Sequence, residues 1–107
     1  MSFILKKRQK YGGTYMDLLN SRVKRDEDIA WRVIEGEALV VDPKGQMIYP
    51  LNEAGTRIWE LIDGKNTCND IVLAISGEFE ADAGDIKKDV LEFTEDLLKK
   101  ELALRCD

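Results

Sequence analysis

Histidine is absent from this chain of 107 residues, and cysteine and proline each occur only twice. Without histidine a conventional zinc site or acid–base dyad loses its usual ligand, and Cys68 and Cys106 form no C-x-x-C pair. No run of about 18 apolar residues occurs, which excludes a membrane-spanning helix. The N terminus places its apolar residues before its basic ones, the reverse of a secretory signal. We therefore predict a cytoplasmic protein with reduced thiols, no metal and no cofactor.

Recognisable catalytic patterns are also missing. The chain has 21 Asp and Glu residues, but no nucleophile motif or ligand cluster accompanies them, so we interpret them as a solvated acidic surface. Gly12-Gly13 is not followed by the Lys-Ser/Thr of a phosphate-binding loop. We predict that the protein is not an enzyme.

Charge is distributed unevenly along the chain. Residues 1–25 contain seven Lys and Arg residues against one acid, Asp17, whereas the remainder contains nine basic and 20 acidic residues. We predict a basic, flexible N-terminal arm over residues 1–25, in which Tyr15 to Val23 could form a short helix, and a folded domain over residues 26–107.

Strand signals occupy the segment between Ile29 and Leu51. Three short stretches rich in β-branched and aromatic residues, 31–34, 38–41 and 46–50, predict strands. Asp42-Pro43-Lys44-Gly45 predicts a type I turn between the second and third of them. Pro50 has no N–H group for a ladder and belongs at an edge or a strand end. The simplest arrangement is a three-stranded antiparallel meander.

Helical signals follow Leu51. Asn52 predicts the N-cap of a first helix that ends at Asp63-Gly64. Thr67 and Asp70 predict a capping box at the start of a second helix, which Gly77 ends. The apolar stripe of the first helix consists of Ala54, Ile58, Leu61 and Ile62, with Trp59 adjacent.

The third predicted helix begins at an Asp82 cap and reaches Lys100 or beyond. It carries two apolar stripes, of which one suffices for packing on the core. The second would need the sheet, a second subunit or a ligand to cover it. The stripes are Ile86, Val90, Phe93 and Leu97, and next to them Leu91, Leu98 and Leu102. The predicted fold is α+β, a three-stranded meander followed by three helices.

Four segments of the chain form a recognisable set: Trp31-Arg32-Val-Ile-Glu-Gly-Glu37, Leu51-Asn52-Glu-Ala-Gly-Thr-Arg-Ile-Trp-Glu-Leu-Ile-Asp-Gly64, Thr67 ahead of Asp70-Ile71, and Asp89-Val90-Leu91-x-Phe93. Together they resemble the PqqD-like family of peptide chaperones, the precursor-peptide recognition elements of ribosomally made and modified peptide pathways. The resemblance covers roughly residues 28–104. The resemblance implies a winged helix-turn-helix-like fold whose sheet accepts the leader of a precursor peptide as an added strand, in a groove between the third strand and the third helix.

An exposed strand edge offers unpaired N–H and C=O groups to an extended peptide, while side-chain pockets select its sequence. We expect the third strand to be that edge and the second stripe of the third helix to form the pocket wall. Lys87 and Lys88 would attract an acidic leader. The expected partners are the leader peptide, a radical SAM or other peptide-modifying enzyme, and in one arrangement a second copy. The predicted peptide-binding residues are Gln46, Met47, Ile48, Tyr49, Lys87, Leu91, Thr94 and Leu98.

Nucleic-acid binding is the alternative, because helix-turn-helix folds commonly serve it. The second predicted helix, Thr67 to Ser76, has no Lys or Arg, and an acidic body repels phosphate. In this alternative the basic arm, residues 1–25, would carry the binding. We interpret Trp31 and Trp59 as core residues, and Asp89 as structural.

Overall fold

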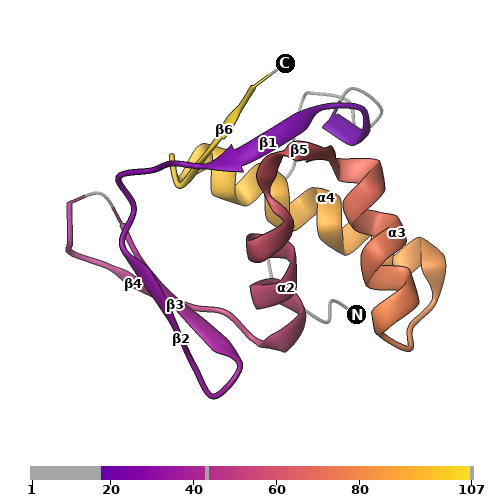
Figure 1. Cartoon of the computed structure of the whole chain (residues 1–107), viewed down its shortest axis with the longest axis horizontal. Helices are drawn as coiled ribbons and strands as arrows, with labels where there is room; N and C mark the ends of the chain where they lie inside the picture. Colours follow the sequence, from indigo (N-terminus) through magenta and orange to yellow (C-terminus); the bar gives the residue numbers. More distant parts are fainter. Residues whose placement is uncertain (1–17, 43, 107) are drawn as a thin grey trace.

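The computed structural model describes residues 18–42 and 44–106, which form an α+β fold with two small sheets and three helices. Figure 1 shows one sheet along one end of the helices and the other beside them. No helix in these ranges is long and apolar enough to cross a membrane. In chain order the elements are β1 (Arg22–Arg25), β2 (Trp31–Ile34), β3 (Glu37–Val41), β4 (Ile48–Pro50), α2 (Glu53–Leu61), β5 (Asp63–Thr67), α3 (Cys68–Glu78), α4 (Ala83–Lys99) and β6 (Ala103–Arg105).

The predicted meander is confirmed as the antiparallel sheet β2-β3-β4. Glu35 and Gly36 both have positive φ angles, 53° and 83°, which a two-residue hairpin loop between right-twisted strands requires. The next turn is closed by a 2.9 Å hydrogen bond from the Gly45 N–H to the Asp42 carbonyl. The third strand is shorter than predicted, since Gln46 and Met47 precede it.

The second sheet, β5-β1-β6, was not predicted. Arg22–Arg25 was assigned to the arm, and in part to a short helix, but it is the central strand of this sheet, with Val23 fully buried. Three of the four residues of β1 are charged, and only Val23 is buried. The alternation of buried and exposed residues that marks a strand was therefore too short to recognise in the sequence. The domain therefore begins earlier than residue 26. The rest of the predicted arm, residues 1–17, lies outside the described residues.

The predicted helix starts are confirmed. The side chain of Asn52 accepts a hydrogen bond from the Gly55 N–H (2.8 Å), and the Thr67–Asp70 capping box is complete. Asp82 caps α4. The first helix ends two residues before the predicted Asp63-Gly64: α2 ends at Leu61, and Ile62 is its C-cap. Gly64 has the predicted left-handed φ of 84°, but it lies in strand β5, which pairs with β1.

One continuous core lies between the helices and both sheets. Both apolar stripes predicted for the third helix contribute to it: Leu91 of α4 and Leu102, which follows α4, are each 1% exposed, and Leu98 packs against the cluster. The second stripe is therefore covered by other parts of the same chain. A second subunit is not needed to cover it. A buried hydrogen bond from the Ala38 N–H to Thr56 Oγ1 (2.8 Å) joins the meander to α2.

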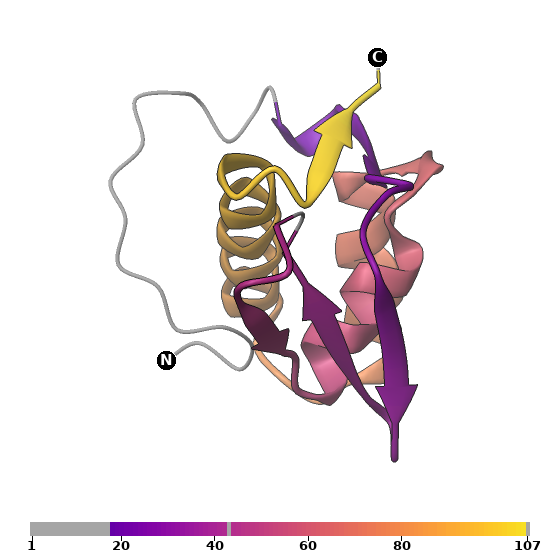
Figure 2. The ribbon, with the colours of Figure 1, turned by 90° about the vertical axis from the view of Figure 1, so that its left-hand side faces the viewer.

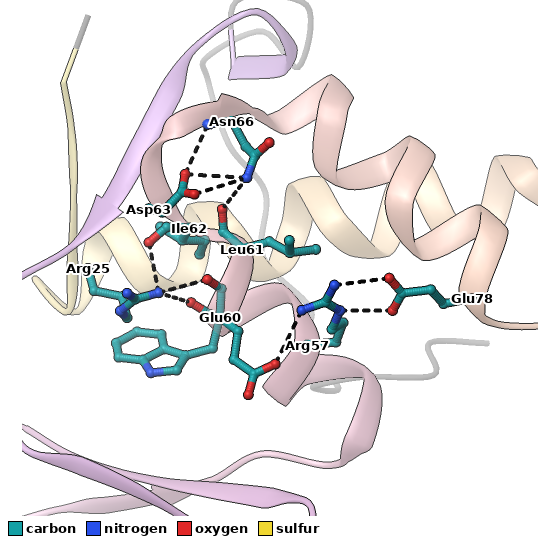
Figure 3. Close-up of polar contacts among 9 residues, drawn as sticks. Arg25, Arg57, Glu60, Leu61, Ile62, Asp63, Asn66 and Glu78 are labelled. Carbon is teal, nitrogen blue, oxygen red and sulfur yellow. Dashed lines mark hydrogen bonds and ion pairs between the residues drawn. The ribbon is translucent and has the colours of Figure 1, made fainter.

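Arg25 is the last residue of β1, just before the segment that leads to β2, and its side chain binds the end of α2 (Figure 3). Its Nη1 donates to the carbonyls of Trp59 (2.7 Å), Glu60 (3.0 Å) and Ile62 (3.1 Å). The guanidinium also lies 5.3 Å from the centroid of the Trp31 ring. Trp59 is buried as predicted, whereas Trp31 is 37% exposed and meets Trp59 edge-on. These contacts fix how the meander stands relative to the helices.

Candidate functional site

Among residues 18–42 and 44–106, strand β4 pairs only with β3, so it forms one edge of the meander. Figure 2 shows β4 as the strand of the meander nearest to α4. The edge is solvent-exposed at its start, where Met47 is 53% and Ile48 60% exposed. An unpaired edge beside a helix is a surface to which an extended chain could be added.

The hydrogen-bonding direction of each β4 residue follows from the register. The Asp42 N–H donates to the Met47 carbonyl (3.0 Å), and the Leu51 N–H donates to the Ala38 carbonyl (2.8 Å). Hydrogen-bonded and non-hydrogen-bonded pairs alternate along an antiparallel ladder. Between these two pairs, Tyr49 must therefore face its β3 partner with its N–H and C=O groups.

Ile48 consequently directs its N–H and C=O toward the open edge. It pairs with Val41 of β3 in a non-hydrogen-bonded position. Pro50 has a C=O in the same direction but no N–H to donate. Of the three residues of β4, only Ile48 thus offers both a backbone N–H and a backbone C=O to a chain at the open edge.

A cavity of about 370 Å³ lies between the β3–β4 connection and the end of α4. Tyr49 contributes an aromatic wall, and Lys44, Lys99 and Lys100 contribute cationic groups. Asp42 and Glu101 are its acidic members, and Asp42 Oδ1 accepts a hydrogen bond from the Gln46 N–H (2.8 Å). The cavity can therefore receive a side chain that combines apolar and polar groups.

Lys100 connects the two walls of this cavity. Its ammonium lies 5.6 Å from the centroid of the Tyr49 ring and 2.5 Å from Oδ2 of Asp96. The Asp96 side chain is 3% exposed, so a buried carboxylate holds the ammonium in place. The backbone supports the arrangement, because the Lys100 N–H donates to the Asp96 carbonyl (3.0 Å) and Glu101 turns the chain with a φ of 61°.

The predicted residues of the third helix lie elsewhere. Leu91 is 1% and Thr94 0% exposed, so both belong to the core. On an α-helix Leu98 points about 160° away from Asp96, the residue that holds Lys100. Lys87 is exposed and shares the face of Leu91. The cavity beside β4 is instead lined by Lys99 at the end of α4 and by Lys100 and Glu101, which follow it. A role of Lys87 and Leu98 in peptide binding stays a prediction.

The binding residues predicted on the third strand do lie together, at the start of β4 and just before it. Gln46 and Tyr49 line the cavity, and Met47 and Ile48 are exposed at the edge. Lys100 was not among the predicted binding residues. Its i, i+4 spacing from Asp96 could have predicted the ion pair. Its contact with Tyr49 could not be predicted, because the two residues are far apart in the chain.

The site offers backbone groups, cations and an aromatic ring, which are binding groups. Within residues 18–42 and 44–106, no group of three or more His, Cys, Asp and Glu residues is placed to hold a metal ion. The arrangement suits non-covalent capture of an extended peptide.

Comparisons with known proteins agree with the fold. The family model of coenzyme PQQ synthesis protein D (PqqD) matches residues 37–103. The solved structure of TbiB1 in complex with the TbiA(beta) leader peptide has a TM-score of 0.66 and 26% identity, covering 75% of this chain and 93% of that one.

A lasso peptide synthetase B1 complexed with the leader peptide has a TM-score of 0.68, covering 78% of this chain and 99% of that one. At 15% identity it supports the fold alone. No curated protein matches the chain at a comparable level of significance.

Proposed function

The chain belongs to the PqqD family, and from that premise we propose that it is a non-catalytic recognition domain that binds the leader segment of a precursor peptide. The leader adds as a strand to the open edge of β4 and places side chains against the end of α4. The observation that carries this proposal is the outward N–H and C=O pair of Ile48, beside the Tyr49–Lys100 cavity. The resemblance to TbiB1, whose structure contains a leader peptide, supports it.

The geometry defines how the peptide would lie. One leader residue pairs with Ile48 through two backbone hydrogen bonds, which supply affinity without reading the sequence. Side chains of an added strand alternate between its two faces, so those on one face reach the cavity beside Tyr49. Selectivity then comes from the fit of these side chains to the aromatic ring and the lysines of the cavity.

The proposed role includes delivery to a second protein. A domain that captures a leader without catalytic groups of its own needs a modifying enzyme to act on the rest of the precursor. By family analogy that enzyme is a radical SAM protein or another peptide-modifying enzyme. The nucleic-acid alternative is less well supported, because α3 contains no Lys or Arg with which to contact phosphate.

An NMR titration tests the proposal. The isotopically labelled full chain is titrated with the leader of a precursor peptide encoded beside its gene, and with a scrambled peptide of the same composition. We expect saturable amide shifts at Ile48 and Tyr49 and at the Lys100 end of α4 with the genuine leader only. Equal responses to both peptides, or shifts that avoid β4, would falsify strand addition at this edge.

A further inference from the structure

A second groove lies near the β2–β3 turn, away from the β4 edge. Two adjoining cavities of about 360 and 250 Å³ share the side chains of Glu53 and Phe79. They are bounded by the hairpin, the first turn of α2 and the end of α3, which Figure 1 shows at one end of the molecule. Phe79, half-buried, forms an apolar floor together with Ala54 and Val33. We call this surface the Phe79 groove.

The rim of the Phe79 groove is strongly acidic. Among the described residues that line it, Arg57 is the one cation. Its Nε and Nη2 donate to the two carboxylate oxygens of Glu78 at 2.9 and 3.1 Å, and its Nη1 lies 3.4 Å from Glu60 (Figure 3). These pairs satisfy Arg57 within the rim. The remaining rim carboxylates, those of Glu37, Glu53 and Glu80, make no ion pair with any described residue.

An occupant of this groove should combine apolar side chains with adjacent basic ones. The chain itself contains such a segment, Phe3-Ile4-Leu5-Lys6-Lys7-Arg8-Gln9-Lys10. Its three apolar residues match the apolar floor, and its four cations match the carboxylates of the rim. We propose that residues 3–10 dock in the Phe79 groove of the same molecule.

The chain is long enough for this contact. Ten residues separate Arg8 from Leu18, where the described part begins, and an extended chain of that length spans at most about 33–36 Å. The longest dimension of the described fold is 34 Å. A tethered segment has an effective concentration in the millimolar range, so even a weak contact is populated.

Docking has a physical consequence for partner choice. It covers an apolar floor and neutralises part of the acidic rim, and it holds the most basic segment of the chain away from anionic ligands. The contact is separate from the β4 edge, so it does not depend on the leader-binding proposal.

Paramagnetic relaxation in the full chain tests the contact. A nitroxide is attached through Gln9→Cys in a Cys106→Ser background; Cys68 is buried and stays unlabelled. We expect the loss of amide signal to be greatest at Glu37, Glu53 and Phe79 and to be much weaker in strand β6, which lies at the opposite end of the molecule (Figure 1). The loss should diminish at about 1 M salt, where the Debye length falls to about 3 Å.

Matched variants identify the cause. The triple variant Glu37→Gln/Glu53→Gln/Glu80→Gln should recover the lost signals, and so should Lys6→Glu/Lys7→Glu/Arg8→Glu in the arm. The control Glu27→Gln/Glu92→Gln/Glu101→Gln removes the same number of charges elsewhere and should leave the signal loss intact.

Three outcomes overturn the inference: signal loss spread evenly over the acidic surface, signal loss that persists in the groove variant, or no signal loss at the groove. A mixture of labelled chain without nitroxide and unlabelled chain with nitroxide tests docking between copies. Signal loss at the groove in that mixture would also overturn the intramolecular contact.

Discussion

Tyr49 and Lys100 meet at the end of α4, with the ammonium 5.6 Å from the ring centroid. The contact joins the edge strand of the meander to the last turn of the longest helix, across the cavity in which we place the peptide side chains. The same ammonium forms an ion pair with Asp96, so the position of Lys100 depends on a buried carboxylate. Both fold stability and peptide binding should respond to changes here.

Replacing Lys100 with methionine should destabilise the fold. Lys100→Met keeps the aliphatic stem but removes one partner of a nearly buried carboxylate, and hydrogen bonds to charged groups contribute about 1.5–3 kcal/mol. Urea unfolding should therefore show a loss of about that size. Lys88→Met removes an exposed lysine elsewhere on α4 and should change the free energy of unfolding by less than about 0.5 kcal/mol. Equal losses in the two variants would argue against a special role for Lys100.

Replacing Ile48 with proline should separate binding from folding. The Ile48 N–H points away from β3, so its loss removes no ladder bond, and proline is tolerated on edge strands. Leader affinity should fall by about tenfold, or 1.4 kcal/mol, when the outward donor is lost. Isothermal titration calorimetry and thermal unfolding measure the two quantities. Ile48→Ala keeps the donor and serves as the control; if it weakens binding as much as Ile48→Pro does, side-chain contact rather than strand pairing dominates.

Removing the hydroxyl of Thr94 should stabilise the protein. Thr94 is fully buried, and its Oγ1 has no hydrogen-bond partner among the described residues. An unsatisfied buried polar group costs about 1–3 kcal/mol, so Thr94→Val should raise the denaturation midpoint and leave leader affinity unchanged. A selective loss of affinity would restore Thr94 to the binding site.

Removing Arg25 should loosen the meander. Its guanidinium donates to three carbonyls at the end of α2 and stacks on Trp31. Arg25→Ala should reduce the free energy of unfolding by about 2 kcal/mol and change the near-UV circular dichroism of the packed tryptophans. Arg32→Ala, an exposed arginine on β2, should leave both nearly unchanged. An unaltered tryptophan signal in Arg25→Ala would contradict the proposed contact.

Glu95 predicts a pH dependence. Burial raises its pKa, and Oε1 is buried without a hydrogen-bond partner among the described residues. A carboxyl group whose folded pKa is raised destabilises the folded state once it ionises, so its penalty grows as the pH rises from the unfolded value of about 4.3. Glu95→Gln should therefore be more stable than wild type at pH 7, and the difference should vanish below about pH 4. A difference that is constant with pH would exclude ionisation as its cause.

The local features of the fold could be predicted because they are encoded within a few residues. Asn52, Thr67–Asp70 and Asp82 each satisfy helix-terminal N–H groups by their own side chains. The β2–β3 and β3–β4 turns follow from glycine and short-range hydrogen bonds in the same way. The family resemblance covers this part of the chain, and the family match to residues 37–103 confirms it.

The second sheet could not be predicted, because its pairs are far apart in the chain and its strands look polar. β1 pairs with β5 and with β6, which begin at Asp63 and Ala103. One buried valine in Arg22–Arg25 gives too little pattern to distinguish a strand from a basic arm. The pairing becomes favourable only once the helices have brought these segments together.

By itself, the sequence determined which segments become the meander and the helices, where the helices begin, and which strand could offer an edge. Tertiary structure decided which face of α4 meets that edge. A helix with two apolar stripes can pack either stripe against the core, and here residues of both stripes are part of the core. Packing on two sides buried Leu91 and Thr94 and left the Asp96–Lys100 side beside Tyr49, because burial of all available apolar surface stabilises the fold more than exposure of one stripe would.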